Sequence, residues 1–134
     1  MFVTAFYAIY DSRDRTLRYA RAGHNPPRLV QSGAVRSLDC VGGLPLGFGL
    51  TDEPYESHKI ALHRGDHLLL YTDGITEARN PLGDMFGVEN LDAALCKDCT
   101  QATEVISSVL DGLNLFTGDI AAGDDQTLFA ASVV

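Results

Sequence analysis

Residues 68–80 are LLLYTDGITEARN, a run of apolar residues that passes directly into Thr72-Asp73-Gly74. A short, continuous apolar run bounded by turn residues is typical of a strand buried on both faces. Two explanations account for a carboxylate at the end of such a strand. Asp-Gly is a common turn pair, or the strand delivers Asp73 to a cation.

The segments around this stretch predict a sheet-rich chain. Aromatic, β-branched or alternating residues predict strands at 2–10, 16–23, 55–62 and 128–134, and a short hairpin at 28–38 that turns at Ser32-Gly33. Apolar residues spaced by three and four predict helices over 87–95 and 100–116, the second capped by Thr100 and buried along Val105, Ile106, Val109, Leu110 and Leu113. Strands followed by helices favour the α+β class, and 134 residues fit one domain, 1–134.

The composition excludes several classes of function. Asp and Glu outnumber Lys and Arg by 18 to 10, for a net charge of −8. This balance argues against nucleic acid and anionic membrane surfaces, where basic residues supply most of the affinity. No apolar run approaches the length of a membrane span, and no signal peptide is recognisable. Three cysteines fit a reduced chain better than a disulfide framework, so we expect a cytoplasmic protein.

A second acidic feature, Asp124-Asp125, precedes the final strand. Adjacent carboxylates repel each other unless a cation or hydrogen-bond donors offset the repulsion, although a solvated turn accounts for the same residues. Two acidic turns that each adjoin an apolar strand would bring Asp73, Asp124 and Asp125 to one end of a sheet. Oxygen ligands of this kind suit Mg²⁺ or Mn²⁺. Three carboxylates would still be few for two metal ions.

The remaining candidates favour structural roles. His24 lies in a loop, where bonding to the backbone is a better interpretation than general acid catalysis. Cys96 and Cys99 form a lone CxxC without the second pair that zinc requires or a thioredoxin-like context. The glycine-rich residues 41–50 match neither a P-loop nor a dinucleotide fingerprint and predict a loop.

Five blocks in series carry a family resemblance: MFVTAFYAIYD at 1–11, LRYARAGHNPPRLV at 17–30, GGLPLGF at 42–48, residues 65–87 and DDQTLFAASVV at 124–134. Together they resemble the bacterial serine/threonine phosphatases of the protein phosphatase 2C superfamily. The branch is that of the sigma-regulating phosphatases, which includes stage II sporulation protein E. The blocks occur in the family's order and cover essentially the whole chain.

The resemblance implies an antiparallel β-sandwich flanked by helices, with two Mn²⁺ or Mg²⁺ ions at one end. Asp73 matches the aspartate of the family's Thr-Asp-Gly motif. Asp124 and Asp125 match the acidic positions of its second metal motif. The implied activity is hydrolysis of phosphoserine or phosphothreonine. The implied partner is a phosphorylated anti-sigma-factor antagonist or a similar regulator. Of the two explanations for Asp73, the resemblance therefore favours the cation over the turn.

The sequence also departs from the family pattern. The family's early Gly-Asp and Asp-x-x-Gly-His-Gly blocks, which supply further metal-site aspartates, have no counterpart here. We therefore expect the N-terminal part of the domain to be absent, little activity from this chain alone, and a homo-oligomer or a poorly soluble monomer. The alternative is an inactive phosphatase-like module that binds a regulatory partner. A redox or zinc protein built on the CxxC is a distant third hypothesis.

Overall fold

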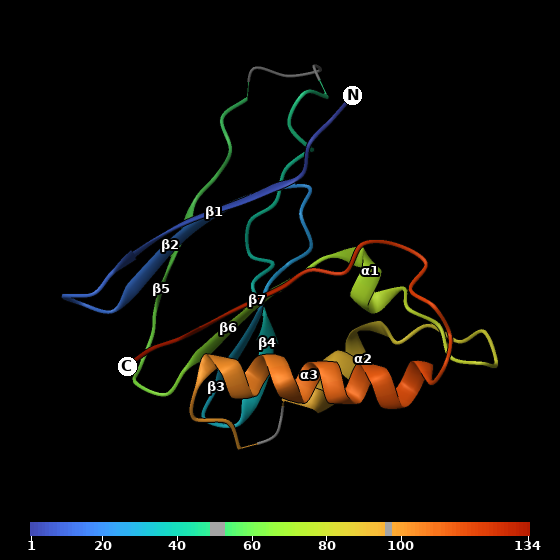
Figure 1. Ribbon diagram of the computed structural model, residues 1–134. Helices are drawn as coiled ribbons and strands as arrows, with labels where there is room; N and C mark the ends of the chain where they lie inside the picture. Colours follow the sequence, from blue (N-terminus) through green and yellow to red (C-terminus); the bar gives the residue numbers. More distant parts are fainter. Residues whose placement is uncertain (49–52, 96–97) are drawn as a thin grey trace. The chain divides into compact units, whose positions relative to one another are not determined.

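The computed structural model describes residues 1–48, 53–95 and 98–134 (Figure 1). The chain forms two compact units. Unit 1 comprises Met1–Pro26 and Leu38–His63. Unit 2 comprises Pro27–Ser37 and Arg64–Val134. Each unit contains one antiparallel sheet.

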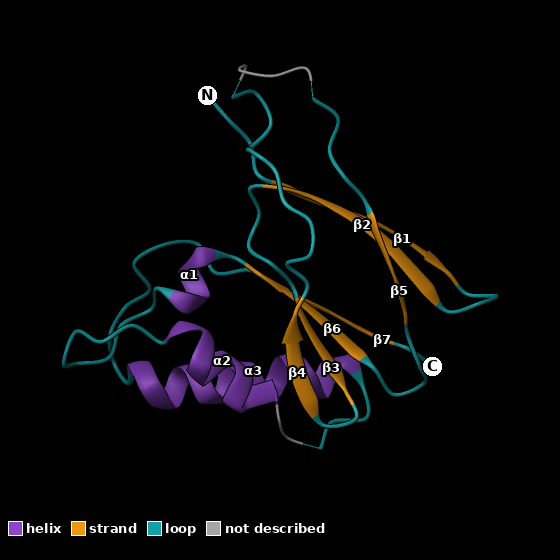
Figure 2. Cartoon of the chain, turned by 180° about the vertical axis from the view of Figure 1, so that it is seen from behind, coloured by secondary structure: helices purple, strands orange, loops and turns teal. Residues whose placement is uncertain are grey.

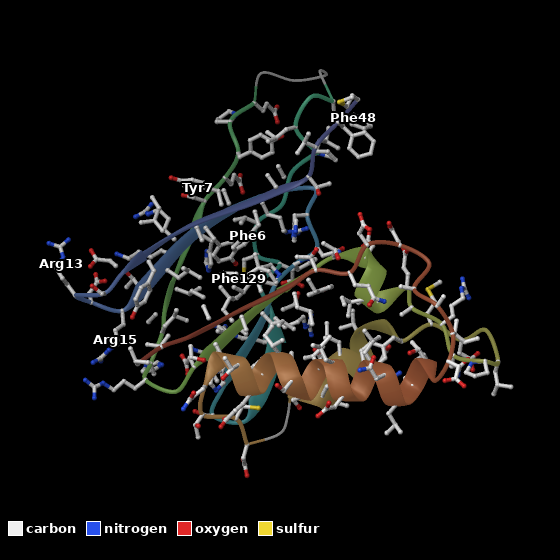
Figure 3. The ribbon with its side chains drawn as sticks, viewed as in Figure 1. Phe6, Tyr7, Arg13, Arg15, Phe48 and Phe129 are labelled. Carbon is white, nitrogen blue, oxygen red and sulfur yellow. The ribbon has the colours of Figure 1, made fainter. Side chains whose placement is uncertain are left out.

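Unit 1 is built on a sheet of three strands in the order β1-β2-β5, which span Ala5–Asp11, Thr16–Ala22 and His58–Ala61. β1 and β2 form the predicted hairpin, in register from Ala5 opposite Ala22 to Asp11 opposite Thr16. Tyr19 of β2 is 1% exposed, and its ring contacts the rings of Phe6 and His58. Arg13 and Arg15 lie at the end of this hairpin (Figure 3).

The Arg21 side chain holds two loop segments of unit 1 through hydrogen bonds to their carbonyls. Arg21 donates from Nε to the carbonyl of Val41, at 3.1 Å, and from Nη1 to that of His24, at 2.9 Å. The predicted glycine-rich loop is confirmed over its described part, residues 41–48, which contains only an isolated bridge from Leu46 to Val3. The rest of that segment lies outside the described residues.

Unit 2 is built on a sheet of four strands in the order β4-β3-β6-β7. The strands span Ala34–Ser37 (β4), Arg28–Gln31 (β3), His67–Tyr71 (β6) and Leu128–Ser132 (β7). The helices are α1 at Asp73–Thr76, α2 at Gly87–Leu95 and α3 at Ala102–Thr117. Helices α2 and α3 lie over one face of the sheet (Figure 2).

The core of unit 2 joins this sheet face to the helices. Leu69 is fully buried on β6, and α3 presents residues four apart, Val105, Val109 and Leu113, to the same cluster. That spacing places side chains on one face of a helix. The other buried members of the cluster are Val30, Tyr71, Ile75, Ala78, Phe86, Leu91, Ala94 and Leu95.

Most predicted elements are confirmed, with three corrections. A turn was one of the two explanations for Asp73-Gly74, and the structure has the short helix α1 there. The N-cap of α3 is Gln101 rather than Thr100, because Gln101 has extended backbone angles and forms a capping box with Glu104. Leu110 is 40% exposed and is not on the buried face. Within the described ranges, no helix combines the length and apolarity needed to span a bilayer.

Candidate functional site

Asp73 lies immediately after β6, the central buried strand of unit 2. Thr72 has extended backbone angles and is the N-cap of α1, so the chain changes from strand to helix within one residue. The Asp73 carbonyl accepts from the backbone N–H of Glu77 at 2.8 Å. The Asp73 side chain is exposed. The strand therefore fixes the backbone of Asp73 and leaves its carboxylate at the surface.

The two predicted acidic turns are joined by hydrogen bonds. Thr72 donates from its backbone N–H to the carbonyl of Thr127 at 3.2 Å, and its Oγ1 accepts from the Thr127 N–H at 3.0 Å. The Thr72 hydroxyl also donates to the carbonyl of Asp125 at 3.4 Å. Gln126 donates from Nε2 to the carbonyl of Gly74 at 3.1 Å. These bonds hold the segment around Asp125 beside the segment around Asp73.

Gly74 permits this close approach. A Cβ placed on Gly74 would lie 2.1 Å from the carbonyl oxygen of Asp125, a distance that no real side chain tolerates. Glycine is commonly required where another backbone approaches this closely. The sequence Thr-Asp-Gly is thus explained residue by residue: Thr72 binds the second turn, Asp73 presents a carboxylate, and Gly74 leaves room for Asp125.

Asp124 and Asp125 lie in the irregular segment before β7, and both are exposed. The Asp125 backbone N–H donates to Oδ1 of Asp124 at 2.8 Å, which orients that carboxylate. Both residues therefore come from the turn that the Thr72 and Gln126 bonds hold in place.

The donor chemistry of this site fits Mg²⁺ or Mn²⁺, because all three predicted ligands offer carboxylate oxygens. The hydrogen bonds of Thr72 and Gln126 bring the two turns together, but they do not involve the carboxylates themselves. Among the described residues, no three His, Cys, Asp or Glu side chains come together as a ready-made metal cluster. The assignment of Asp73, Asp124 and Asp125 as ligands therefore stays a prediction.

The other candidates have structural partners. His24 donates from Nδ1 to the carbonyl of Asn25 at 2.9 Å, in line with the backbone-bonding interpretation. Cys99 is half-buried and its carbonyl lies 2.9 Å from Nε2 of His67, while Cys96, the other half of the CxxC, lies outside the described residues.

Sequence reasoning missed two polar contributors in unit 2. His67 is 5% exposed, and its ring lies between the Ser132 hydroxyl, 2.7 Å from Nδ1, and the Cys99 carbonyl, 2.9 Å from Nε2. Since a carbonyl only accepts, Nε2 carries the proton. The second contributor is Gln126, whose amide holds Gly74. A glutamine between two motif residues gave no sequence signal of that contact.

Comparisons with known proteins place the chain in context. The family model described as stage II sporulation protein E (SpoIIE) matches residues 1–134. The phosphoserine phosphatase RsbU of Bacillus subtilis is 32% identical over 129 residues, which cover 96% of this chain and 38% of RsbU. The chain spans 20% and 38% of the length of two curated relatives that it matches, of which the second is RsbU.

Two solved structures show the same fold. The SiaA-PP2C domain of Pseudomonas aeruginosa superposes with a TM-score of 0.81 at 23% identity, covering 96% of this chain and 51% of that one. The phosphatase domain of SpoIIE from Bacillus subtilis, from a manganese-presoaked crystal, gives a TM-score of 0.72 at 16% identity, covering 97% and 56%. The predicted α+β fold of the protein phosphatase 2C type is confirmed.

Proposed function

Because the chain belongs to the stage II sporulation protein E family of protein phosphatase 2C-type domains, we propose that it is part of a metal-dependent phosphoserine/phosphothreonine phosphatase. The proposal rests on the observation that hydrogen bonds join the two acidic turns of the chain. Thr72 bonds to Asp125 and Thr127, and Gly74 approaches Asp125 so closely that only glycine fits. A turn that served only to reverse the chain would not need a second acidic segment fixed against it.

Each residue of the site has a part in this function. Asp73, Asp124 and Asp125 would hold Mn²⁺ or Mg²⁺ through carboxylate oxygens. A divalent cation held there would supply an activated water and would neutralise charge on the phosphoryl oxygens. Thr72 and Gln126 keep the two turns at a fixed separation through their bonds to Asp125, Thr127 and Gly74. Fixed ligands matter because misplaced groups lose much of their catalytic effect.

The proposed substrate is a phosphorylated regulatory protein of the anti-sigma-factor antagonist type, in the cytoplasm. Support comes from RsbU, which bears the name phosphoserine phosphatase, and from the manganese-soaked SpoIIE crystal, which suits the cation class proposed here.

One observation favours a second candidate function. The described residues bring no three potential ligands together, as expected of an inactive phosphatase-like module that binds a regulator. The two candidates differ in whether Asp73 binds a cation.

Calorimetric titration with Mn²⁺ separates them. We expect the unmodified chain to bind Mn²⁺ and the Asp73→Asn variant to lose most of that binding. The control is Asp119→Asn, which removes another exposed acid of unit 2 and should leave binding unchanged. Absence of binding by the unmodified chain, or equal losses in both variants, contradicts the proposal and favours the inactive module. Little turnover of a phosphoserine peptide is expected from the 134-residue chain alone.

A further inference from the structure

Helices α2 and α3 leave an apolar pocket of about 350 Å³ on the surface of unit 2. Its lining includes Phe86 at the start of α2 and Gly112, Leu115 and Phe116 on α3. The Phe86 and Phe116 rings meet edge to face, with centroids 5.4 Å apart. Leu115 is 88% exposed, although transfer of a leucine side chain out of water is favourable.

Small residues create this pocket. A Cβ placed on Gly112 would lie 3.5 Å from the Cβ of Ala94, so the two helices come close at this point. Ser108 donates to the carbonyl of Ala94 at 2.8 Å and fixes their separation. Three of the lining residues, Phe86, Ala94 and Phe116, belong to or pack against the core of unit 2, so the floor of the pocket is preformed.

An acidic hollow lies along the same helix. Glu104 and Asp111 line a second pocket, of about 400 Å³. Glu104, Asp111 and Leu115 are seven and four residues apart, which places them on one side of α3. At 1.5 Å per residue this stripe is about 16 Å long. The stripe and the two pockets, called the α3 groove below, are therefore acidic towards the N-terminal half of α3 and apolar towards its C-terminal end.

The charged side chains that α2 and α3 carry are all acidic, and one of them, Asp92, is paired with Arg28 of β3. Helices α2 and α3 contain Glu89, Asp92, Glu104 and Asp111 and no Lys, Arg or His. No basic residue occupies the last turn of α3. The partial negative charge at a helix C-terminus stabilises nearby cations. An acidic ligand would be repelled along the whole groove, and a purely basic one would leave the apolar pocket unfilled.

We propose that the α3 groove is a docking site for a basic amphipathic segment of a partner protein. An apolar side chain of that segment fills the pocket beside Leu115 and Phe116, and lysine or arginine side chains meet Asp111, Glu104 and the end of α3. Amphipathic segments that place apolar anchors in a groove are a recurring mode of peptide recognition. The proposal does not depend on the proposed function, because docking involves neither Asp73 nor a metal.

The test uses three synthetic peptides and the 134-residue chain without added metal. One peptide arranges leucine and lysine as an amphipathic helix, one scrambles that sequence, and one replaces lysine by glutamate. We expect saturable binding, by fluorescence anisotropy, of the first alone. Leu115→Asp should weaken it about tenfold or more, as truncation of a central anchor commonly does. Asp111→Asn should weaken it less and reduce its dependence on salt.

The matched control is Leu82→Asp. Leu82 is 86% exposed, nearly the same as Leu115, but it does not line the pocket, so binding should be unchanged. Equal binding of the scrambled peptide, or equal losses in the two leucine variants, overturns the proposal. So does absence of binding to the amphipathic basic peptide. If sedimentation shows self-association of the unmodified chain that Leu115→Asp abolishes, the groove holds a second copy and the proposal is also overturned.

Discussion

Units 1 and 2 each contain an antiparallel sheet, yet they bury their apolar residues differently. Unit 2 encloses a cluster that joins β6 to α2 and α3, with Leu69 and Leu91 fully buried. In unit 1, β1 is the end strand of its sheet and leaves Tyr7 69% and Ile9 55% exposed. Phe6 and Tyr7 leave β1 on opposite sides, as alternation along a strand requires (Figure 3).

This difference explains why the backbone of the candidate metal site is firmly supported. Thr72, Asp73 and the segment around Asp125 all belong to unit 2, whose sheet is packed on helices. A backbone segment that is held against a closed core loses little freedom when its residues bind a ligand. The apolar residues that β1 exposes offer no comparable support within unit 1.

The largest effect should follow from a cavity in unit 2. Leu69→Ala removes a fully buried side chain from the core cluster and should lower the free energy of unfolding by about 2–5 kcal/mol. Ile9→Ala in unit 1 is the control, and substitutions at such an exposed site usually change stability by about 0.5 kcal/mol or less. Urea unfolding measures both. Similar losses would show that β1 is as well packed as β6.

Gly74→Ala should come next. Its Cβ would meet the carbonyl of Asp125, so the two acidic turns must separate, and crowding of this kind costs about 1–3 kcal/mol. Gly123→Ala is the control at the same site, because a Cβ there meets no atom within 4 Å. Thermal unfolding gives the stability, and Mn²⁺ calorimetry should show weaker binding for Gly74→Ala only. Equal behaviour of the two variants would contradict the role given to Gly74.

A smaller difference in stability is expected between variants that remove two similar ion pairs. In unit 2, Arg28 and Asp92 join β3 to α2 through bonds of 2.8 and 2.6 Å, with side chains 11% and 28% exposed. In unit 1, Arg13 and Asp11 form the same paired contact, but Arg13 is 88% exposed. Asp92→Asn should destabilise by about 1 kcal/mol, whereas Asp11→Asn should change the urea midpoint little, as exposed pairs usually do. A larger loss from Asp11→Asn would reverse this ranking.

The sequence predicted more of the fold than of the site's geometry. Alternation and short apolar runs predicted the strands, and spacings of three and four predicted both long helices. The continuous apolar run predicted burial on both faces of β6, whereas Leu68 and Leu70 are only half-buried. The sequence placed Asp73 and Asp125 in two acidic turns at one end of a sheet, and the resemblance then assigned both to a metal site. The bonds of Thr72 and Gln126 across more than fifty residues depend on tertiary packing, which no local pattern encodes. The exposure of Leu110 escaped prediction for the same reason.

The smallest effect concerns the start of α3 and depends on pH. Three donors, the N–H and hydroxyl of Thr100 and the N–H of Gln101, bond to one oxygen of Glu104 and hold the pKa of that carboxyl below its ordinary value of 4.5. A lowered pKa in the folded state stabilises the protein above pH 4.5, and this contribution is lost as the pH falls through the folded-state pKa. Glu104→Gln should therefore be less stable than the unmodified chain at neutral pH, with a difference that narrows on acidification. Glu56→Gln, at an exposed position of unit 1, is the control. A difference between Glu104→Gln and the unmodified chain that stays constant from pH 7 to pH 3 would show that the carboxylate's charge contributes nothing to the cap.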